Sequence, residues 1–315
     1  MKTSQDLVLL GKTGIKITPV GVGTWAWGDR LVWGYGGSAY DDSDIQEAFD
    51  VSLDNGANWF DTAEVYGMGR SERFLGKFIP TATREVLVAT KFFPFPWRLR
   101  KEALIRNLKD SLKRLQLSRV DLYQIHMPFG QWTKPGYITA LADAVSAGLT
   151  RAVGVSNFNL ERTKLSNETL KAAGVPLASN QVEFSLFDRR IEKNGLLDYC
   201  LENEITIIAY SPLAKGMVTG KYGPENPPSG PRKRMYPPEK LQRAQPLISL
   251  LKEIGEQYGK TPAQVALNWT ICKGTVPIPG AKNAKQAADN LGAMGWRLSP
   301  EAVSALDEAS NVLAG

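Results

Sequence analysis

The chain has 315 residues, of which 43 % are hydrophobic and 22 % are charged, which are ordinary proportions for a folded globular protein. This composition argues against a disordered, collagen-like or coiled-coil protein, and the length suits a single α/β barrel domain. The formal net charge is +6, but Lys and Arg alternate with acidic residues, as in residues 101–121. The pattern predicts solvated helix faces rather than a nucleic-acid surface.

The two cysteines, Cys200 and Cys272, are far apart and have no histidine nearby, so the sequence predicts neither a disulfide framework nor a metal site. Residues 1–14 lack the apolar core of a signal peptide, and no run approaches the ~18 apolar residues of a membrane span. We therefore expect a protein of a reducing compartment with no membrane partner. The prediction is the cytoplasm, or the plastid stroma if a transit peptide has been removed, and the oligomeric state is left open.

The pattern of elements begins with residues 7–20, where two short apolar runs flank a glycine-containing turn and predict an N-terminal β-hairpin. Strand-like and helix-like segments alternate after it. The predicted strands are 18–24, 56–61, 85–91, 120–126, 150–156, 177–183, 205–211 and 275–280. The predicted helices that follow them are 42–55, 69–79, 101–115, 137–148, 160–174, 192–203, 246–259 and 283–294. Eight such units without a linker predict one (β/α)8 TIM barrel domain over residues 1–315.

An open dinucleotide-binding sheet is disfavoured, because such a sheet carries GxGxxG after its first strand. The two nearest matches, "GVGTWA" at Gly21 and "GMGRSE" at Gly67, both lack the third glycine. Two segments exceed a minimal barrel: an extra C-terminal helix over residues 299–310, and a long loop from Lys215 to Lys240 after the seventh strand. This loop is interpreted either as a lid over a bound anion or as a solvated insertion.

Four chemically complementary side chains follow three neighbouring strands of the predicted barrel. Asp61 ends the second strand, Tyr66 lies in the next loop, Lys91 ends the third strand, and His126 follows the fourth and is the only histidine. In barrels of this type the chemistry lies at the carboxyl ends of the strands. Taken singly, each residue also has a structural interpretation, as a helix cap or a packing residue.

Together, the four side chains suit the reduction of a carbonyl group. Hydride addition to a carbonyl carbon leaves an alkoxide, which needs a proton, and a phenol is a weak acid unless it is assisted. An ammonium beside Tyr66 would lower the pKa of that phenol. Lys91 would supply the ammonium, Asp61 would hold Lys91, and His126 would bond the substrate oxygen or help to relay the proton.

Seven sequence motifs resemble, in order, those of the aldo-keto reductase superfamily. They are "NWFDTAEVYG", "VATKF", "DLYQIHMP", "GVSNF", "SNQVEFS", "AYSPLAKG" and "IPGAKNAKQAADN". The resemblance implies a catalytic tetrad of Asp61, Tyr66, Lys91 and His126, with NADP(H) extended across the barrel mouth. Residues 23–36 and 225–232 look most like a subgroup found in cyanobacteria and plastids.

The same resemblance implies the cofactor contacts. Ser156, Asn157 and Gln181 are similar to groups that bind the carboxamide, and Tyr210 to an aromatic stacked on the nicotinamide. Other residues, placed near the nicotinamide, the pyrophosphate or the adenosine, are Gly23, Thr24, Trp25, Asp61, Ser211, Pro212, Leu213, Lys215, Gly216, Lys221, Gly280, Ala281, Lys282, Gln286, Asp289 and Asn290. Because many relatives carry Arg where Gln286 stands, Lys282 is expected to meet the 2′-phosphate of NADPH.

The substrate is a small carbonyl compound that the sequence does not name. Trp25, Trp27, Trp33, Phe93 and Met127 are expected to form an apolar wall, or else to pack at the barrel rim. The favoured function is NADPH-dependent reduction of aldehydes or ketones, with Tyr66 as the proton donor. The alternative is a sensor of cofactor occupancy, as the potassium-channel β subunits of this superfamily are thought to be. A metal-dependent hydrolase would need several histidines or clustered carboxylates at the strand ends.

Overall fold

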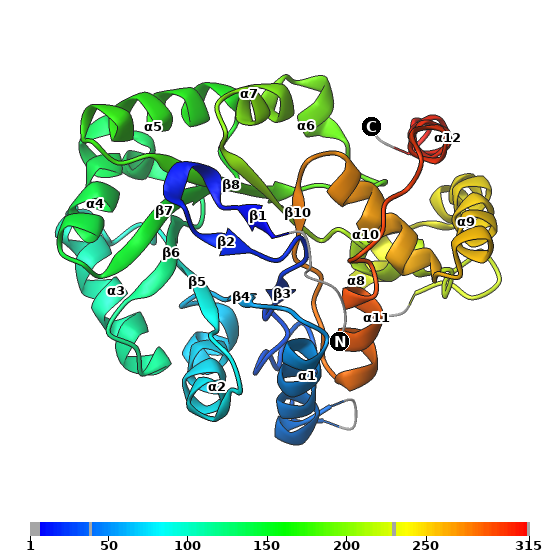
Figure 1. The fold of residues 1–315 in the computed structure, drawn as a ribbon, viewed down its shortest axis with the longest axis horizontal. Coiled ribbons are helices and arrows are strands. Elements are labelled where there is room, and N and C mark those ends of the chain that lie inside the picture. The colour runs from blue at the N-terminus through cyan, green and yellow to red at the C-terminus, as the bar shows by residue number, and fades with distance from the viewer. Residues whose placement is uncertain (1–6, 38–39, 229–230, 314–315) are drawn as a thin grey trace.

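The computed structural model describes residues 7–37, 40–228 and 231–313, in which helices surround a curled sheet of eight parallel strands (Figure 1). The strands follow one another around the sheet in chain order. They are β3 (Val22–Gly23), β4 (Trp59–Asp61), β5 (Leu87–Phe92), β6 (Val120–Ile125), β7 (Thr150–Ser156), β8 (Leu177–Glu183), β9 (Thr206–Tyr210) and β10 (Val276–Pro277). This arrangement agrees with the predicted (β/α)8 barrel.

The first and last strands close the barrel through glycine backbone. Gly21 N donates to Pro277 O and Gly23 N to Pro279 O, each at 3.0 Å, and Gly23 forms a parallel bridge with Gly280. A Cβ on Gly23 would lie 2.8 Å from Ile278 O. Closure therefore requires glycine at position 23, because any side chain would hold the two strands apart.

The predicted N-terminal hairpin is confirmed, and it covers the amino-terminal end of the barrel. Strands β1 (Val8–Leu9) and β2 (Lys16–Ile17) are antiparallel and are joined through the 3₁₀ turn η1 (Gly11–Thr13). The hairpin crosses the middle of the sheet in Figure 1. Leu10, Ile15 and Ile17 join a buried apolar cluster with inward side chains such as Trp59 and Leu122. The hairpin thus excludes water from this end.

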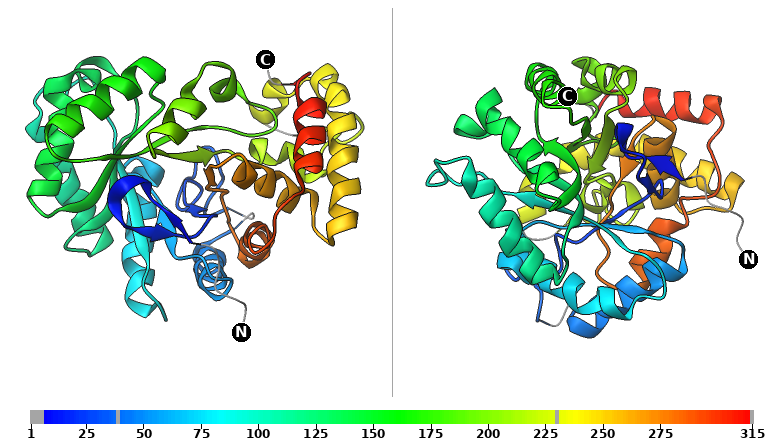
Figure 2. Two further views of the ribbon diagram at one scale, coloured as in Figure 1. Left: turned by 45° about the horizontal axis from the view of Figure 1, so that its top comes forward. Right: turned by 60° about the vertical axis from the view of Figure 1, so that its left-hand side comes forward.

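The outer layer consists of helices, several of which begin at a side chain that caps the first turn. Asp41, Asn159, Thr261, Asn283 and Ser299 each accept a backbone N–H of the first turn. The helices are α1 (Asp42–Asp54), α2 (Arg70–Phe78), α3 (Glu102–Leu115), α4 (Pro135–Ser146), α5 (Leu160–Ala172), α6 (Arg190–Lys193), α7 (Leu196–Glu202), α8 (Pro231–Met235), α9 (Pro238–Tyr258), α10 (Pro262–Cys272), α11 (Ala284–Leu291) and α12 (Pro300–Ser310). α12 lies beside α9, as Figure 2 shows.

Two predictions about the chain before the last strand are corrected. The sequence predicts no helix between residues 259 and 275, yet α10 fills this stretch; its residues 263 and 265–271 are all buried, so it lacks the amphipathic period of a surface helix. The predicted helix over residues 246–259 begins eight residues earlier, at Pro238, with Pro246 in its interior. A proline inside a helix costs about 3 kcal/mol; burial of Leu241 and Ala244 in the added turns opposes this cost.

The segment Lys215–Lys240 is more ordered than predicted. It includes most of η5 (Ala214–Thr219), all of α8 and the start of α9, while residues 229 and 230 lie outside the described residues. Tyr236 is buried, and its hydroxyl donates to Ala214 O at 3.0 Å, which ties the end of the segment to its beginning. No helix within the described ranges is long and apolar enough to cross a membrane.

Candidate active site

The four predicted catalytic residues meet at the carboxyl end of the barrel. Asp61 is the last residue of β4, Lys91 lies in β5, His126 follows β6, and Tyr66 begins the 3₁₀ turn η2 (Tyr66–Gly69). The strands are neighbours, and Lys91 pairs in register with Gln124 of β6. The sheet register therefore brings together side chains that are up to 65 positions apart in the sequence.

Lys91 is the hub of the four residues. Its Nζ forms a buried ion pair with Asp61 Oδ1, donates to Thr62 O at 2.8 Å, and lies 3.4 Å from the hydroxyl of Tyr66. The rings of Tyr66 and His126 meet edge to face with their centroids 5.6 Å apart. The arrangement has the contacts expected for a phenol assisted by an ammonium.

Two glutamines complete the surroundings of Asp61. Gln181 Nε2 donates to Asp61 Oδ2 at 2.8 Å, and Gln124 Nε2 lies 3.4 Å from the same oxygen. A buried carboxylate is stable only if it is paired and hydrogen-bonded. Both oxygens of Asp61 meet this condition, so the carboxylate can hold Lys91 in its protonated form.

Burial, rather than the charge of Lys91, controls the pKa of Tyr66. Desolvation raises the pKa of Tyr66 above its ordinary value, and the opposing charge of Lys91 does not compensate, which corrects the expectation of a lowered pKa. Burial lowers the pKa of Lys91, but the charge of Asp61, together with Tyr66 and the hydrogen bonds to both, more than offsets it and the net pKa is raised. Burial and the charge of Lys91 hold the pKa of His126 well below 6.5. At neutral pH the site thus contains a phenol, an ammonium and a neutral imidazole.

The residues expected at the nicotinamide form one network with the catalytic residues. Tyr210 donates from its hydroxyl to Asn157 Oδ1 at 2.9 Å, and Asn157 Nδ2 donates to His126 O at 3.2 Å. Ser156 Oγ donates to Gln181 O at 2.9 Å. Since Gln181 also bonds Asp61, the expected carboxamide site and the ion pair share a partner.

The loop that follows β9 has a strained backbone. Ser211, Ala214 and Lys215 have φ values of 50°, 47° and 56°, and Gly216 has φ 96°. Left-handed conformations are uncommon for residues other than glycine and cluster at ligand sites. Within this loop Pro212 is buried and Leu213 is half-buried, and Lys215 pairs with Glu183 at 3.7 Å. Lys221, farther along, lies 5.4 Å from the ring of Tyr222.

The expected adenosine site adjoins the start of α11. Lys282 Nζ lies 4.7 Å from the ring centroid of Trp33 and 5.0 Å from that of Tyr40. Its backbone N–H donates to Gln286 Oε1 at 2.9 Å, so Gln286 holds the loop that carries the lysine. Asn290 has the same kind of role, because it is buried and donates to Gly280 O at 3.1 Å.

Other residues expected at the cofactor have structural contacts of their own. Asp289 Oδ1 accepts from Thr261 Oγ1 at 2.9 Å, and Ala281 is buried and accepts from Trp27 Nε1 at 2.8 Å. Thr24 is fully buried, and its Oγ1 donates to Asp61 O at 2.9 Å. The donor set nevertheless fits a nicotinamide dinucleotide. An ammonium, a left-handed loop and a helix start suit an anion, and the hydroxyl of Ser156 and the amides of Asn157 and Gln181 suit a carboxamide.

Four of the five residues expected in the substrate wall lie at the mouth of the barrel. Trp25 is 40 % exposed, and its ring is 6.3 Å from Tyr66 and 5.5 Å from Trp33. Phe93 is 5.6 Å from the ring of His126, and Met127 Sδ contacts Asn157 Nδ2 at 3.2 Å.

Trp27 is a correction to that wall. It is fully buried and packs against the rings of Phe60 and Phe78 at 6.0 and 6.1 Å. Trp25 and Trp27 of the "TWAW" stretch thus have different environments, and only Trp25 reaches the rim of the barrel.

Sequence reasoning missed Gln124 and Glu64. Gln124 lies two residues before His126 on β6, and because side chains alternate along a strand, the spacing places it on the inward face. Glu64 lies two residues before Tyr66 and accepts the backbone N–H of Phe93 at 2.6 Å. The two-residue period of a strand could have predicted Gln124 from His126. Nothing in the local sequence indicated that Glu64 bonds the backbone of Phe93.

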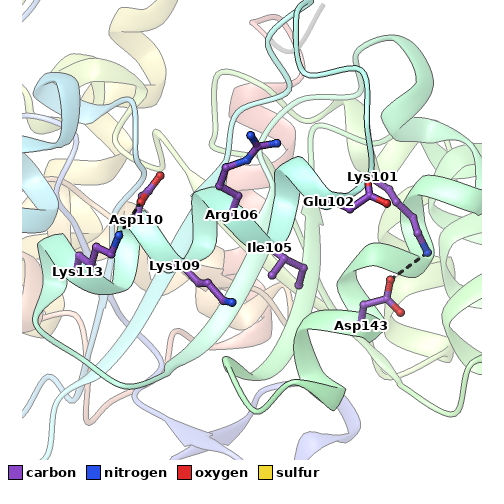
Figure 3. Close-up of a pocket in the computed structure, with 8 residues that line it drawn as sticks. All are labelled: Lys101, Glu102, Ile105, Arg106, Lys109, Asp110, Lys113 and Asp143. Atoms are coloured by element: carbon purple, nitrogen blue, oxygen red, sulfur yellow. Dashed lines mark hydrogen bonds and ion pairs between the residues drawn. The ribbon is translucent and has the colours of Figure 1, made fainter.

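A separate hollow of about 450 Å³ runs along the outer face of α3 and α4 (Figure 3). Four of its charged groups form two ion pairs, Lys101 with Asp143 at 3.3 Å and Lys113 with Asp110 at 3.5 Å. It belongs to the helical layer and contains none of the predicted site residues.

The family model described as "Aldo/keto reductase family" matches residues 19–311. The chain belongs to the aldo-keto reductase family. The resemblance drawn from the seven motifs is thereby confirmed, and the protein is an oxidoreductase of a family that acts on carbonyl groups.

Three similar proteins each cover more than four fifths of this aldo-keto reductase. The chloroplastic pyridoxal reductase of Arabidopsis thaliana is 42 % identical, over 94 % of this chain and 84 % of its own. An aldo-keto reductase of Schizosaccharomyces pombe whose name specifies NADP(+) is 32 % identical, over 82 % and 80 %. The structure of a glycerol dehydrogenase from Gluconobacter oxydans has a TM-score of 0.84 at 27 % identity and covers 96 % of this chain and 94 % of its own.

Proposed function

We propose that this aldo-keto reductase catalyses the NADPH-dependent reduction of aldehydes or ketones to alcohols, with Tyr66 as the proton donor. The observation that carries the proposal is the position of Lys91, which bridges the carboxylate of Asp61 and the hydroxyl of Tyr66 beside the ring of His126. A buried ammonium between a carboxylate and a phenol is costly to maintain for stability alone. The arrangement suits a proton transfer to a substrate oxygen.

The direction of the pKa shift of Tyr66 supports its role as an acid. A raised pKa keeps the phenol protonated at neutral pH, so the proton is available when an alkoxide forms. Because an alkoxide is a much stronger base than a phenolate, the transfer runs toward the substrate. The ammonium of Lys91, 3.4 Å away, then stabilises the phenolate that remains.

His126 would orient the substrate as a neutral group. Its lowered pKa leaves the imidazole uncharged at neutral pH, and Asn157 holds its backbone carbonyl. A neutral imidazole can hydrogen-bond a carbonyl oxygen without competing with Tyr66 as the acid. His126 therefore orients the substrate carbonyl, and Tyr66 supplies the proton.

NADPH, when bound, supplies the hydride. Ser156, Asn157, Gln181 and Tyr210 would hold the nicotinamide end, the loop over residues 211–216 the pyrophosphate, and Lys282 the 2′-phosphate. The NADP(+) in the name of the Schizosaccharomyces pombe relative supports this choice of cofactor.

The substrate class we favour is an aldehyde with a flat ring. The 42 % identity to a pyridoxal reductase and the aromatic residues Trp25 and Phe93 beside the tetrad support it. The chloroplastic name of the same relative agrees with a plastid stroma, and the cytoplasm is the other compartment proposed.

The test is a panel of carbonyl compounds, including benzaldehyde, propanal and pyridoxal, assayed with NADPH and with NADH. We expect consumption of NADPH with equimolar alcohol formation, and slower turnover with NADH. A protein that binds NADPH tightly but forms no alcohol from any member of the panel would instead support the sensor alternative, since a sensor requires occupancy without turnover.

A further inference from the structure

A row of aromatic side chains leads from the tetrad out to solvent. Phe93, Phe95 and Trp97 follow one another with ring centroids 4.6 Å apart at each step, and the last two rings are nearly parallel at 9°. Phe129 joins Phe93 at 6.0 Å from the next loop, and Phe93 touches His126. We call Phe93, Phe95, Trp97 and Phe129 the aromatic ladder.

The outer part of the ladder is exposed to an extent that packing does not explain. Trp97 is 72 % exposed and Phe129 is 46 % exposed. Apolar side chains that are exposed to water as a group mark a binding surface more often than scattered exposed side chains do. Because this group begins at a catalytic residue, its natural ligand is the substrate.

A buried ion pair fixes the inner end of the ladder. Both carboxylate oxygens of Glu64 accept from the guanidinium of Arg98, and the two side chains are only 7 % and 15 % exposed. Glu64 Oε1 also accepts Phe93 N at 2.6 Å, while Arg98 Nη1 donates to Phe93 O at 2.6 Å. The pair therefore holds the backbone of Phe93 on both sides, and we call it the clamp.

The clamp also connects the two loops that carry the ladder. The guanidinium of Arg98 lies 5.1 Å from the ring centroid of Phe95, and its Nη2 donates to Asn107 Oδ1 at 2.7 Å. The backbone oxygen of Arg98 accepts Trp132 Nε1 at 3.1 Å, three residues beyond Phe129. Only an arginine offers the planar fork that bonds a carboxylate twice and still stacks on a ring.

We propose that Glu64 and Arg98 are a specificity-determining positioning pair that holds the aromatic ladder as the binding surface for the flat ring of an aromatic aldehyde. This inference rests on the proposed function. Glu64 lies two residues before Tyr66, so one loop supplies both the proton donor and the anchor of the ladder. The clamp then sets where a ring lies relative to the proton that Tyr66 delivers.

The experiment compares kcat and KM for benzaldehyde and for propanal in four variants. Phe93→Ala, which removes the ring of the ladder beside His126, is expected to raise KM for benzaldehyde about two- to tenfold, the range for losing an aromatic contact, and to raise KM for propanal much less. Arg98→Met is expected to raise KM for benzaldehyde about tenfold with a smaller change in kcat. Arg98→Lys, which keeps the charge but not the fork, should lie between. Arg100→Met, two positions away and outside the clamp, is the matched control.

The melting temperature and the binding of benzyl alcohol distinguish a role in substrate binding from a role in the stability of the fold. Equal losses on both aldehydes, with a lowered melting temperature, would show that the clamp only supports the fold and would overturn the inference. An unchanged KM for benzaldehyde in Phe93→Ala would overturn it too. Calorimetric binding of benzyl alcohol to the protein with NADP(+) tests the ladder without turnover. If the wild type reduces neither aldehyde, the proposed function fails, and weaker binding of benzyl alcohol by Phe93→Ala still supports the ladder.

Discussion

The two ends of the barrel are built from the same strands and have opposite chemistry. At the amino-terminal end, Trp59 of β4 and Leu122 of β6 point into an apolar cluster that the hairpin covers. Two residues farther along the same strands, Asp61 and Gln124 point into the charged site. Two residues advance a strand by about 6.6 Å. A short step along each strand thus separates a region that stabilises the fold from the proposed active site.

The two ends also differ in how their residues affect the stability of the fold. At the covered end apolar side chains such as Leu10, Ile17 and Leu122 form one buried cluster, so its contribution is packing. The open end holds an ion pair, a strained loop and exposed aromatic rings, each of which opposes stability. Substitutions should therefore separate activity from stability according to the end that they alter.

The largest expected effect is on activity at the open end. Tyr66→Phe removes the proposed proton donor and should lower kcat by about 10³-fold, within the range for general acid catalysis, with NADPH affinity retained. Tyr123→Phe is the matched control, because it also removes a buried phenol hydroxyl, one that faces Leu104 O at 3.4 Å. Steady-state kinetics give kcat for both variants. Near wild-type turnover in Tyr66→Phe would refute the role of Tyr66 as the proton donor.

The next effect is on stability at the covered end. Ile17→Ala leaves a cavity under the hairpin and should lower the free energy of unfolding by about 2–4 kcal/mol while kcat is unchanged. Leu31→Ala, at a side chain that is 98 % exposed, is the control and should leave stability unchanged. Urea unfolding measures the difference. A large loss of kcat in folded Ile17→Ala would show that the two ends are coupled.

A smaller effect, on cofactor binding, should distinguish Lys282 at the open end from Lys16 at the covered end. Lys282→Met is expected to weaken NADPH binding by about 1.5–3 kcal/mol, the range for hydrogen bonds to charged groups, and to leave NADH binding unchanged. Lys16→Met removes an exposed charge from the hairpin and should alter neither. Calorimetric titration with both cofactors is the measurement. Equal weakening of both cofactors by Lys282→Met would remove Lys282 from the 2′-phosphate.

The smallest effect is a pH dependence that belongs to the open end. The pKa of His126 is depressed in the folded protein, so below about pH 6.5 the unfolded chain binds a proton that the folded chain does not. Stability should therefore fall as the pH is lowered below that value, by at most about 1.4 kcal/mol per pH unit for one group. His126→Asn should flatten this part of the curve of unfolding free energy against pH. An unchanged slope would mean that His126 is not held neutral.

Much of this protein follows from its sequence, because local patterns carry the information. Short apolar runs and periodic apolar segments predict the strands and most helices, and polar residues at consecutive strand ends predict Asp61, Tyr66, Lys91 and His126. The failures also have local causes. α10 is apolar all round and shows no helical period, although Thr261 and Gln264 form a capping box that marks its start.

Tertiary structure decided what depends on contacts between distant residues. The direction of the pKa shift of Tyr66 depends on how deeply the folded barrel buries the phenol, which no local pattern records. Trp25 and Trp27 are two residues apart in one motif, yet only the fold exposes the first and buries the second. The pairing of Glu64 with Arg98 joins loops 34 residues apart. Sequence alone determined which side chains reach the end of each strand, because the strand period is local, whereas the environment of each side chain was set by packing between elements.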